Sequence, residues 1–405
     1  MEPIERDLVL VGGGHAVMPI LKNADQWTGQ DLTVTLISDN QYLYYSGMVP
    51  EYLGGIYESG DVKIDLQALC LANNVQFRKS KVVHLDPEKK ELKTADDQHF
   101  RARVMVFDIG SQNPKIPSAE RVSPTKPLHH IEKLAEFIDH VLLGQRHEKK
   151  KNLVIVGGGA AGVEIALNIS ARMKSDQQHT QLGITLIEEH ERLLPQFNPS
   201  LSRYASDLLQ KRGVDVRLCK KTVNLTPEAI QLDDGHTLNY DFVLWATGPV
   251  GQSLFKNAGL DCDKNQFLWV NDTLQHPERP WLFAAGDCSR IKQHPDLRKI
   301  GVHAVKQSRT LHQNVSRVMQ AIISGEDPKS VELEKFEPYT ISPIILSTGG
   351  AEAIWTTPTR WIHNRIMLYI KHWLDMRWIE QYQYPFDRKK SISEKIHAKY
   401  ALHKD

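Results

Sequence analysis

The chain has 405 residues, which is enough for two or three domains with their own hydrophobic cores. The formal net charge is +1 with 24% charged residues, so no overall field favours nucleic acid as a partner. The four scattered cysteines form no CxxC or CxxxxC pair, which argues against a disulfide scaffold, a zinc site and a redox dithiol of the usual spacing. We therefore expect a reducing, cytoplasmic compartment and no metal.

The first predicted element is a buried strand at residues 8–11 that runs into a glycine-rich turn. Gly12 and Gly14 occupy the first two positions of the dinucleotide fingerprint, which allow a tight turn and a close approach to a pyrophosphate. Val17 stands where the third glycine is expected, and a short helix is predicted at 16–23. Alone, this turn fits a nucleotide loop and an ordinary βα turn about equally well.

The second strand, predicted at 33–37, ends without the expected acid. In this arrangement an acidic side chain at the strand end usually binds the adenosine ribose. Ser38 stands there, with Asp39 next to it, and an aromatic loop follows at 42–50. Because ligands bind at the carboxyl ends of the strands in open α/β sheets, we expect this loop to face a cofactor; a packed surface loop is the alternative.

A second nucleotide unit begins at Lys151, after a Pro- and Ser-rich boundary at 114–127. A strand of branched apolar residues leads into a complete fingerprint of three glycines, Gly157, Gly159 and Gly162, and a helix is predicted at 163–173. The two turns lie about 145 residues apart, which indicates that one chain holds two dinucleotides.

The next strand of this unit, predicted at 184–187, ends in Glu188. A carboxylate at this point accepts hydrogen bonds from both ribose hydroxyls and repels a 2′-phosphate, so NADH is favoured over NADPH. Arg192 is close enough in sequence to weaken this preference. Later strands at 242–249 and 281–288 also end in glycine-containing turns.

A long helix is predicted from Lys299 to about Ile323, C-terminal to the segment that carries Gly286 and Asp287. Its N-terminus would place positive partial charge beside a bound group, which suits an anionic reduced flavin. Three residues at its start are catalytic candidates: Lys299, His303 and Gln307. Lys299 would stabilise the reduced flavin, and the other two would line an acceptor pocket. A solvated lysine and an internally satisfied histidine are the ordinary alternatives.

A helix is also predicted at 361–379, near the C-terminus. Its apolar side comprises Ile362, Ile366, Tyr369, Ile370, Trp373 and Met376, and basic residues at 365, 371, 377 and 388–390 accompany it. No apolar run in the chain reaches the ~18 residues of a membrane span, and no signal peptide is indicated. The helix therefore fits a membrane-surface element, with packing on the core or on a dimer partner as the open alternative.

The order of these segments resembles the two-dinucleotide-binding flavoproteins, which include disulfide reductases, type II NADH dehydrogenases and sulfide:quinone reductases. The matching segments are GGGHA at 12–16, DIGS at 108–111, GGGAAGVE at 157–164, ATG at 246–248 and AAGD at 284–287. The resemblance implies FAD on the Gly12 loop with Asp287 in contact, and NAD(H) on the Gly157 loop with Glu188.

The cofactor-binding candidates that follow from the pattern and the resemblance together are Gly12, Gly14, His15, Ala16, Ser38, Asp39, Ser46, Gly47, Gly110, Ser111, Gly157, Gly159, Gly162, Glu164, Glu188, Thr247, Gly248, Gly286 and Asp287. Among these, His15 has no assigned role.

Segments 36–55, 64–66 and 301–308 make the chain look closer still to the type II NADH dehydrogenase-like module attached to some bacterial selenophosphate synthetases. Disulfide reductases need a cysteine pair on the helix after the loop of the first strand pair, and residues 41–60 contain no cysteine. Cys288 adjoins Asp287, but it has no evident cysteine partner.

The resemblance therefore predicts a non-pumping NADH:quinone oxidoreductase with FAD. The alternatives are a sulfide:quinone or selenium- or sulfur-handling flavoprotein, and a redox-sensing interaction protein with slow turnover.

We predict an α/β fold with two Rossmann-like domains and a C-terminal extension. The FAD domain comprises residues 1–118 and 250–328, the NAD(H) domain comprises 119–249, and a segment at 329–405 provides the membrane or dimer contact. The expected partners are NADH, a quinone or another small acceptor, a membrane surface on the inner face of the cell membrane, and a second copy of the chain.

Overall fold

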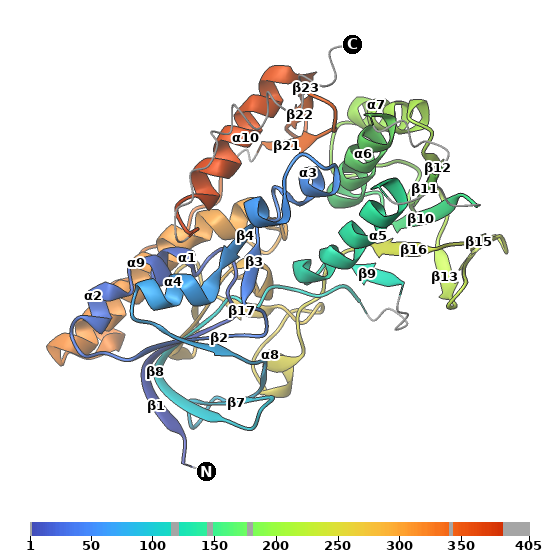
Figure 1. Ribbon diagram of the computed structural model, residues 1–405. Coiled ribbons are helices and arrows are strands. Elements are labelled where there is room, and N and C mark those ends of the chain that lie inside the picture. Colours follow the sequence, from blue (N-terminus) through green and yellow to red (C-terminus); the bar gives the residue numbers. More distant parts are fainter. Residues whose placement is uncertain (1, 115–120, 144–148, 176–180, 340–342, 384–405) are drawn as a thin grey trace.

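The computed structural model describes residues 2–114, 121–143, 149–175, 181–339 and 343–383. It contains two sheets with parallel cores, a small C-terminal sheet and a helix that runs along the outside of the molecule (Figure 1). The predicted α/β class with Rossmann-like sheets is therefore confirmed.

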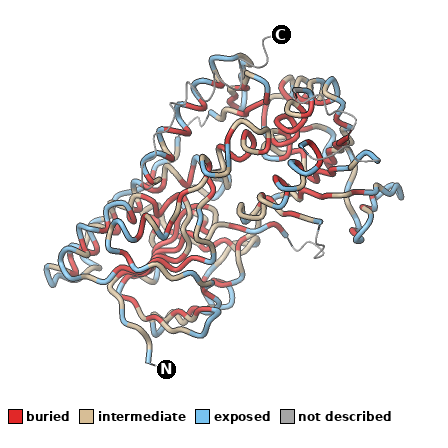
Figure 2. The backbone as a smooth tube through the Cα atoms, viewed as in Figure 1, coloured by how far each residue is buried: buried red, intermediate tan, exposed pale blue. Residues whose placement is uncertain are grey.

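The first sheet has the strand order β18-β19-β8-β1-β2-β5, with β6 and β7 attached through β8. Its strands are β1 Ile4–Val11, β2 Val34–Ser38, β5 Gln76–Lys79, β6 Val82–Asp86, β7 Glu91–Thr94, β8 His99–Phe107, β18 Gln275–His276 and β19 Arg279–Ala284. β1 lies between β2 and β8 and is parallel to both. Figure 2 shows the buried strands at the centre of this sheet.

Short elements and one long helix surround the first sheet. They are α1 Met18–Lys22, α2 Asp25–Thr28, β3 Tyr42–Tyr44, α3 Val49–Leu53, η1 Ser59–Val62, β4 Lys63–Asp65, α4 Leu66–Ala72, α8 Leu254–Asn257, β17 Leu268–Val270, η3 Gly286–Cys288, β20 Ser289–Ile291, α9 Gly301–Ser324 and η4 Pro328–Ser330. α1 contacts both α4 and α9, and the end of β19 passes into η3, which contacts α9. The turn after β1 and the turn after β19 are thereby brought to the same edge of the sheet.

The second sheet has the order β12-β11-β10-β16-β9 and is parallel throughout. Its elements are β9 Val122–Pro124, η2 Leu128–His130, α5 Ile131–Leu143, β10 Lys151–Val156, α6 Ala160–Ser175, β11 Leu182–Ile187, α7 Pro199–Lys211, β12 Asp215–Arg217 and β16 Phe242–Trp245. A separate antiparallel sheet comprises β13 Thr222–Leu225, β14 Ala229–Leu232 and β15 Thr237–Asn239. Helix α6 contacts α3 of the first unit and β21 of the C-terminal sheet.

The C-terminal sheet comprises β21 Ile344–Ser347, β22 Ala353–Thr356 and β23 Trp361–Asn364, and helix α10 follows at Arg365–Ile379. The predicted helix at 361–379 is therefore wrong for its first four residues, which pair with β22. The Asn364 side chain then accepts a hydrogen bond from the Met367 backbone N–H at 3.0 Å and begins the helix. Pairing across the sheet overrides the local helical periodicity here.

The predicted apolar side of this helix also needs correction. Ile366, Tyr369, Ile370 and Trp373 are exposed together with Leu374, whereas Met376 is buried on the opposite side. Lys371, which was counted among the basic residues of this segment, is also buried. The basic run at 388–390 lies outside the described residues. No described helix is long and apolar enough to cross a membrane.

Candidate functional site

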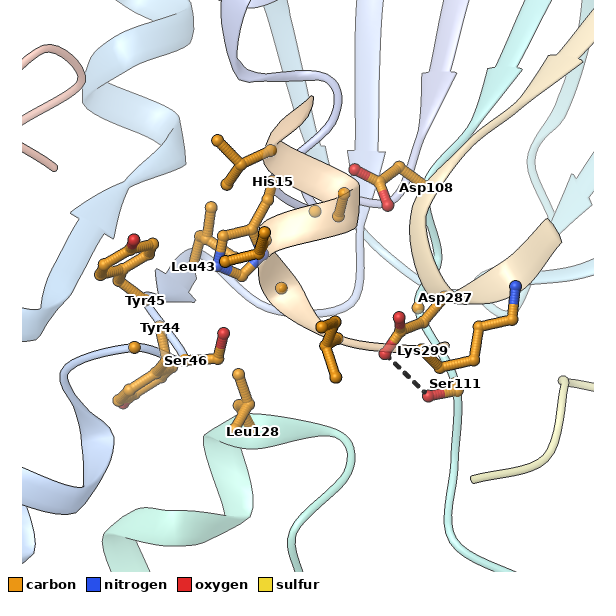
Figure 3. A pocket seen from close by; sticks show the side chains of 18 of the residues that line it. His15, Leu43, Tyr44, Tyr45, Ser46, Asp108, Ser111, Leu128, Asp287 and Lys299 are labelled. Carbon is orange, nitrogen blue, oxygen red and sulfur yellow. Dashed lines mark hydrogen bonds between the residues drawn. The ribbon is translucent and has the colours of Figure 1, made fainter. Parts of the chain in front are cut away.

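A cavity of about 1340 Å³ lies where the first sheet, helix α6 and the C-terminal segment meet. It is lined by the turn after β1, the loop at residues 42–47, Asp287, the first turn of α6, and α10. Figure 3 shows His15, the loop side chains and Asp287 of this lining. Among the predicted site residues, those in the lining are Gly12, Gly14, His15, Ser38, Asp39, Ser46, Gly47, Gly110, Ser111, Glu164, Asp287 and Lys299. The other predicted site residues are outside this lining, namely Ala16, Gly157, Gly159, Gly162, Glu188, Thr247, Gly248, Gly286, His303 and Gln307.

Two positions in the turn after β1, Gly12 and Gly14, have space only for glycine. Gly12 has a φ of +85°, and a Cβ at this position would overlap the backbone of Asp108. A Cβ at Gly14 would overlap the Asp108 carboxyl group. That carboxylate accepts hydrogen bonds from the backbone N–H groups of Ala16 at 2.7 Å and Val17 at 3.3 Å. Asp108 was not among the predicted site residues, although it begins the quoted DIGS segment.

Asp108 is buried, and this burial raises its pKa to about 7. The carboxyl group lies at the end of β8 and closes the turn after β1 from the neighbouring strand. The amides of Ala16 and Val17 are therefore occupied by the protein itself. A bound phosphate would have to use the other groups of this turn.

Asp287 lies on the opposite side of the cavity from His15 in Figure 3. Its carboxylate accepts a hydrogen bond from Ser111 Oγ at 3.4 Å and forms an ion pair with the Lys126 ammonium. Burial alone would raise the pKa of Asp287, but the charges of Lys126 and Lys299 offset it, so this pKa lies below its ordinary value. Lys126 comes from the Pro- and Ser-rich boundary, where the sequence offered no signal of a functional lysine.

The three catalytic candidates on and before α9 have different surroundings. The Lys299 ammonium donates to the Ser289 carbonyl and lies 4.8 Å from the centre of the Phe267 ring, so in Figure 3 its amine points away from the Asp287–Ser111 pair. Burial lowers the pKa of Lys299 to about 8.

Gln307 and His303 lie behind the cavity wall. Gln307 Oε1 accepts a hydrogen bond from the Gly286 backbone N–H at 2.6 Å, which fixes the turn that carries Asp287. His303 is buried, its Nδ1 atom has no hydrogen-bond partner among the described residues, and burial lowers its pKa to about 4. The imidazole is therefore neutral at physiological pH.

The turn after β10 shows the complete glycine pattern in three dimensions. Gly157 has a φ of +115°, and a Cβ there would lie 2.6 Å from the Ala246 carbonyl oxygen. A Cβ at Gly162 would overlap the Gly157 carbonyl, whereas a Cβ at Gly159 would meet no atom within 4 Å. The open space at Gly159 is the feature that a pyrophosphate needs.

Glu188 is held beside this turn by the backbone. Its Oε2 atom accepts from the Gly158 N–H at 2.6 Å and its Oε1 atom from the His190 N–H at 2.9 Å. The Arg192 guanidinium donates to the carbonyl oxygens of Pro195 at 2.7 Å and Phe197 at 3.2 Å. Because these donors are engaged there, Arg192 is poorly placed to offset the preference against a 2′-phosphate that the sequence predicts for Glu188. Nearby, Thr247 accepts a hydrogen bond from the Asn113 amide through its carbonyl at 2.8 Å.

A buried charged cluster borders the cavity between α3, α6 and α10. The Lys371 ammonium contacts Glu51 Oε1 at 2.5 Å, Asp375 Oδ2 at 2.8 Å and the Gly47 carbonyl at 2.5 Å. Glu164, which lines the cavity from α6, accepts a hydrogen bond from the Ser347 N–H at 2.7 Å. We call Glu51, Glu164, Lys371 and Asp375 the carboxyl–lysine cluster.

Burial favours the protonated form of two carboxyl groups in the carboxyl–lysine cluster, those of Glu164 and Glu51. Burial raises the pKa of Glu164 to about 8, while the Lys371 charge opposes the rise and Glu51 adds to it. Burial also raises the pKa of Glu51. Burial opposes the charge on Lys371, but its carboxyl neighbours hold the pKa of this lysine well above its ordinary value. The i, i+4 spacing of Lys371 and Asp375 was the one local signal of this cluster.

Apolar side chains form the cavity wall next to the carboxyl–lysine cluster. They come from the C-terminal sheet and α10 and comprise Ile344, Leu346, Trp355, Ile362, Met367, Ile370 and Leu374. Cys288, in contrast, is buried in the core, where its thiol contacts the carbonyl oxygens of Ala285 at 3.2 Å and Phe107 at 3.4 Å. Burial raises the pKa of this thiol to about 12, so it does not supply a thiolate to the cavity.

Comparison with known proteins identifies a matching family and similar relatives. A family model described as pyridine nucleotide-disulphide oxidoreductase matches residues 6–307. A type II NADH:quinone oxidoreductase from Staphylococcus saprophyticus is 22% identical over 395 residues, which cover 92% of this chain and 94% of the relative.

Among solved structures, NDH2 from Plasmodium falciparum in complex with NADH is similar, with a TM-score of 0.78 and 13% identity over 98% of this chain and 97% of that chain. The sulfide:quinone oxidoreductase of Aquifex aeolicus has a TM-score of 0.72 and 17% identity over 98% and 96% of the two chains. These structural likenesses establish a shared fold.

Proposed function

Because the chain belongs to the pyridine nucleotide-disulphide oxidoreductase family, we propose that it passes electrons from NADH through FAD to a quinone. The balanced reaction is NADH + H⁺ + quinone → NAD⁺ + quinol. FAD and NADH are the cofactors of this family, which confirms the prediction from the sequence. The quinone as acceptor is the proposal.

The cavity fits a flavin dinucleotide. It is large, its Gly12 and Gly14 positions exclude any side chain, and the buried His15 Nε2 atom beside them has no partner among the described residues. We assign the Gly12–His15 turn, Ser111 and Asp287 to FAD, and the Gly157 turn with Glu188 to NADH. Bound there, the flavin supplies hydride acceptance and a two-electron relay.

The observation that carries the choice of acceptor is a proton-holding carboxyl group beside an apolar wall. A quinone takes up two protons with its two electrons, and it is an apolar molecule. Glu164 is protonated below about pH 8, and it lines the same cavity as Ile370 and Leu374 of α10. We therefore assign Glu164 as the proton donor to the acceptor.

The exposed apolar side chains of α10 support a membrane-surface location for the acceptor. Ile366, Tyr369, Ile370, Trp373 and Leu374 are each at least 40% exposed, which is unusual for one helix face in a soluble domain. A quinone dissolved in the membrane would reach the apolar wall from this side. We propose that the protein is cytoplasmic and that this face contacts the inner face of the cell membrane. The alternative is that the same face forms a homodimer contact.

The half-reactions of the purified yellow protein test this function. Stopped-flow mixing with NADH should bleach the flavin, and a second mixing with a short-chain quinone should restore its colour. We expect Glu164→Gln to slow the second step about 100-fold, with the first step little changed. Glu136→Gln, an exposed substitution on α5, is the matched control. Fast bleaching without reoxidation by quinone in the wild-type protein would exclude a quinone acceptor.

The second step should also depend on pH in a defined direction. The pKa of Glu164 is about 8, so the acid form is present below this value and is lost as the pH rises through it. Reoxidation by quinone should therefore slow above about pH 8 in the wild-type protein. In Glu164→Gln the remaining rate should no longer follow this titration.

A further inference from the structure

An aromatic stack connects the turn after β1 to the end of α10. The His15 and Trp378 rings are stacked, with centroids 5.2 Å apart and an interplanar angle of 29°. Tyr45 stacks on the same indole at 4.4 Å and 20°, and Tyr382 contacts it at 5.1 Å. Trp378 itself lines the cavity, as does His15. A residue near the C-terminus therefore contacts a residue of the nucleotide turn, although 363 positions separate them in sequence.

Helix α10 is anchored to the first unit at several points around this stack. The Lys371 ammonium donates to the Gly47 carbonyl, and the Gln383 amide donates to the Lys63 carbonyl at 2.9 Å. A Cβ at Gly47 would lie 3.0 Å from Asp375 Oδ1, so the two segments are in close contact. Docking of α10 is thus coupled to the loop at residues 42–47, which forms the other wall of the cavity.

The His15 ring has a nitrogen atom that forms no hydrogen bond within the described part of the chain. The residue is 9% exposed, and its Nε2 atom has no hydrogen-bond partner among the described residues. Burial lowers the pKa of His15 to about 4, so the ring is neutral and one of its nitrogens carries a proton. A buried polar nitrogen without a hydrogen-bond partner costs free energy, so this atom indicates a hydrogen bond to a bound ligand.

We propose that Trp378 is a positioning residue for FAD: by stacking on His15 it holds the turn after β1 in the shape that binds the dinucleotide. Docking of α10 and binding of FAD then strengthen each other, because each stabilises the same conformation of this turn. The inference rests on FAD occupying this cavity and is independent of the acceptor, so it can fail while the quinone proposal stands, and the reverse.

Release of FAD from the holoenzyme of the full chain measures this coupling. The fluorescence of the free flavin reports release after dilution. Trp378→Ala should speed release about tenfold, the equivalent of one aromatic stacking pair, and Trp378→Phe should restore release to within about threefold of the wild-type protein. Trp373→Ala is the matched control, because it removes an indole from the exposed face of the same helix.

Two readouts separate positioning from a general loss of structure. The dissociation constant for NADH, measured in the same variants, should stay unchanged, because the Gly157 turn does not contact Trp378. In a His15→Ala background, Trp378→Ala should add no further increase in release, because the stack is already lost. Equal release from Trp378→Ala and wild-type protein would overturn the proposal, as would parallel weakening of NADH binding or independent effects of the two substitutions.

Hydrogen exchange of the wild-type protein provides a test that needs no variant. Removal of FAD should speed exchange of the amides at 371–379 in α10, and α7 serves as the reference helix because it lies on the second unit. Exchange in α10 that is the same with and without FAD would also overturn the coupling.

Discussion

The two glycine-rich turns follow the central strands of the two sheets, but the chain builds them differently. After Gly159, helix α6 begins at once and continues for 16 residues. After Gly14, the residues His15–Val17 form a turn, and the short helix α1 begins only at Met18. Val17 is therefore outside the helix, whereas Gly162, at the matching position, lies in the first turn of α6. This difference explains why a valine is tolerated at one position and not at the other.

The two turns also differ in the source of their supporting carboxylate. In the second unit, Glu188 comes from the next parallel strand and accepts a hydrogen bond from the Gly158 amide. In the first unit, the matching residue is Ser38, whose hydroxyl donates to the nearby Asn40 carbonyl at 2.8 Å. The carboxylate is supplied instead by Asp108, from the strand on the other side of β1. A motif with a missing acid and a missing glycine can thus be completed by tertiary contacts.

The largest effect is expected where a glycine has no tertiary substitute. Gly162→Ala places a Cβ on the Gly157 carbonyl, so the turn must shift, at a cost of about 3 kcal/mol in unfolding free energy. We expect flavin reduction by NADH to fall about 100-fold, because the shifted turn would misplace the bound nicotinamide. Stopped-flow reduction and urea unfolding measure the two effects.

Gly159→Ala is the companion variant, because no atom lies within 4 Å of its new Cβ. It should fold with normal stability and lose affinity for NADH alone. If both variants had the same stability, the tight packing at Gly162 would not be the reason for glycine there.

An intermediate effect is expected at the carboxylate of the second turn. Glu188→Ala removes the acceptor for the ribose hydroxyls and the repulsion of a 2′-phosphate, so kcat/KM for NADH should fall roughly tenfold. The NADPH-to-NADH ratio of kcat/KM should rise, because the repulsion of a 2′-phosphate is gone and the Gly158 amide has lost its carboxylate acceptor. Glu189→Ala changes the same charge at an exposed neighbour and should leave the ratio unaltered; an unaltered ratio in Glu188→Ala would remove the basis for the preference.

The smallest effect on nucleotide binding is expected from placing a glycine at position 17, the third glycine position of the fingerprint. Val17 is fully buried, and Val17→Gly should cost about 2 kcal/mol of unfolding free energy through lost apolar burial. FAD release should change by less than about threefold, because Asp108 still holds the turn. Thermal unfolding measures the change in stability, and the fluorescence of released flavin measures the change in FAD release. A clear gain in FAD affinity would mean that Val17 impairs the turn.

Local pattern was sufficient for the elements of both nucleotide units. Residues 8–11 and 184–187 were predicted as buried strands, and the structure confirms them because branched apolar residues next to glycine-rich turns have one favourable arrangement in a parallel sheet. The strand predicted at 281–288 is confirmed only up to Ala284, because Gly286–Cys288 form the short helix η3. The same reasoning failed at Trp361–Asn364, where a helical period of apolar residues is also compatible with a short strand. Only the pairing with β22 decides between the two.

The functional cavity depends more on contacts that no local pattern contains. Lys126, Asp108 and Trp378 were missed because each acts on a residue more than 90 positions away in sequence. Lys371 was assigned to a basic surface, and the structure instead places it among three carboxyl groups. The charge of a side chain can be read from the sequence, but its burial cannot.

The sequence by itself determined that two glycine-rich turns follow buried strands, and that Glu188 and Asp287 stand at strand ends, because these features depend on neighbours within a few residues. The tertiary structure decided that Asp108 completes the first turn, that Glu164 retains a proton at neutral pH and that α10 closes the cavity over His15. Their physical basis is desolvation and packing between segments that are distant in sequence, and these exist only once the chain has folded.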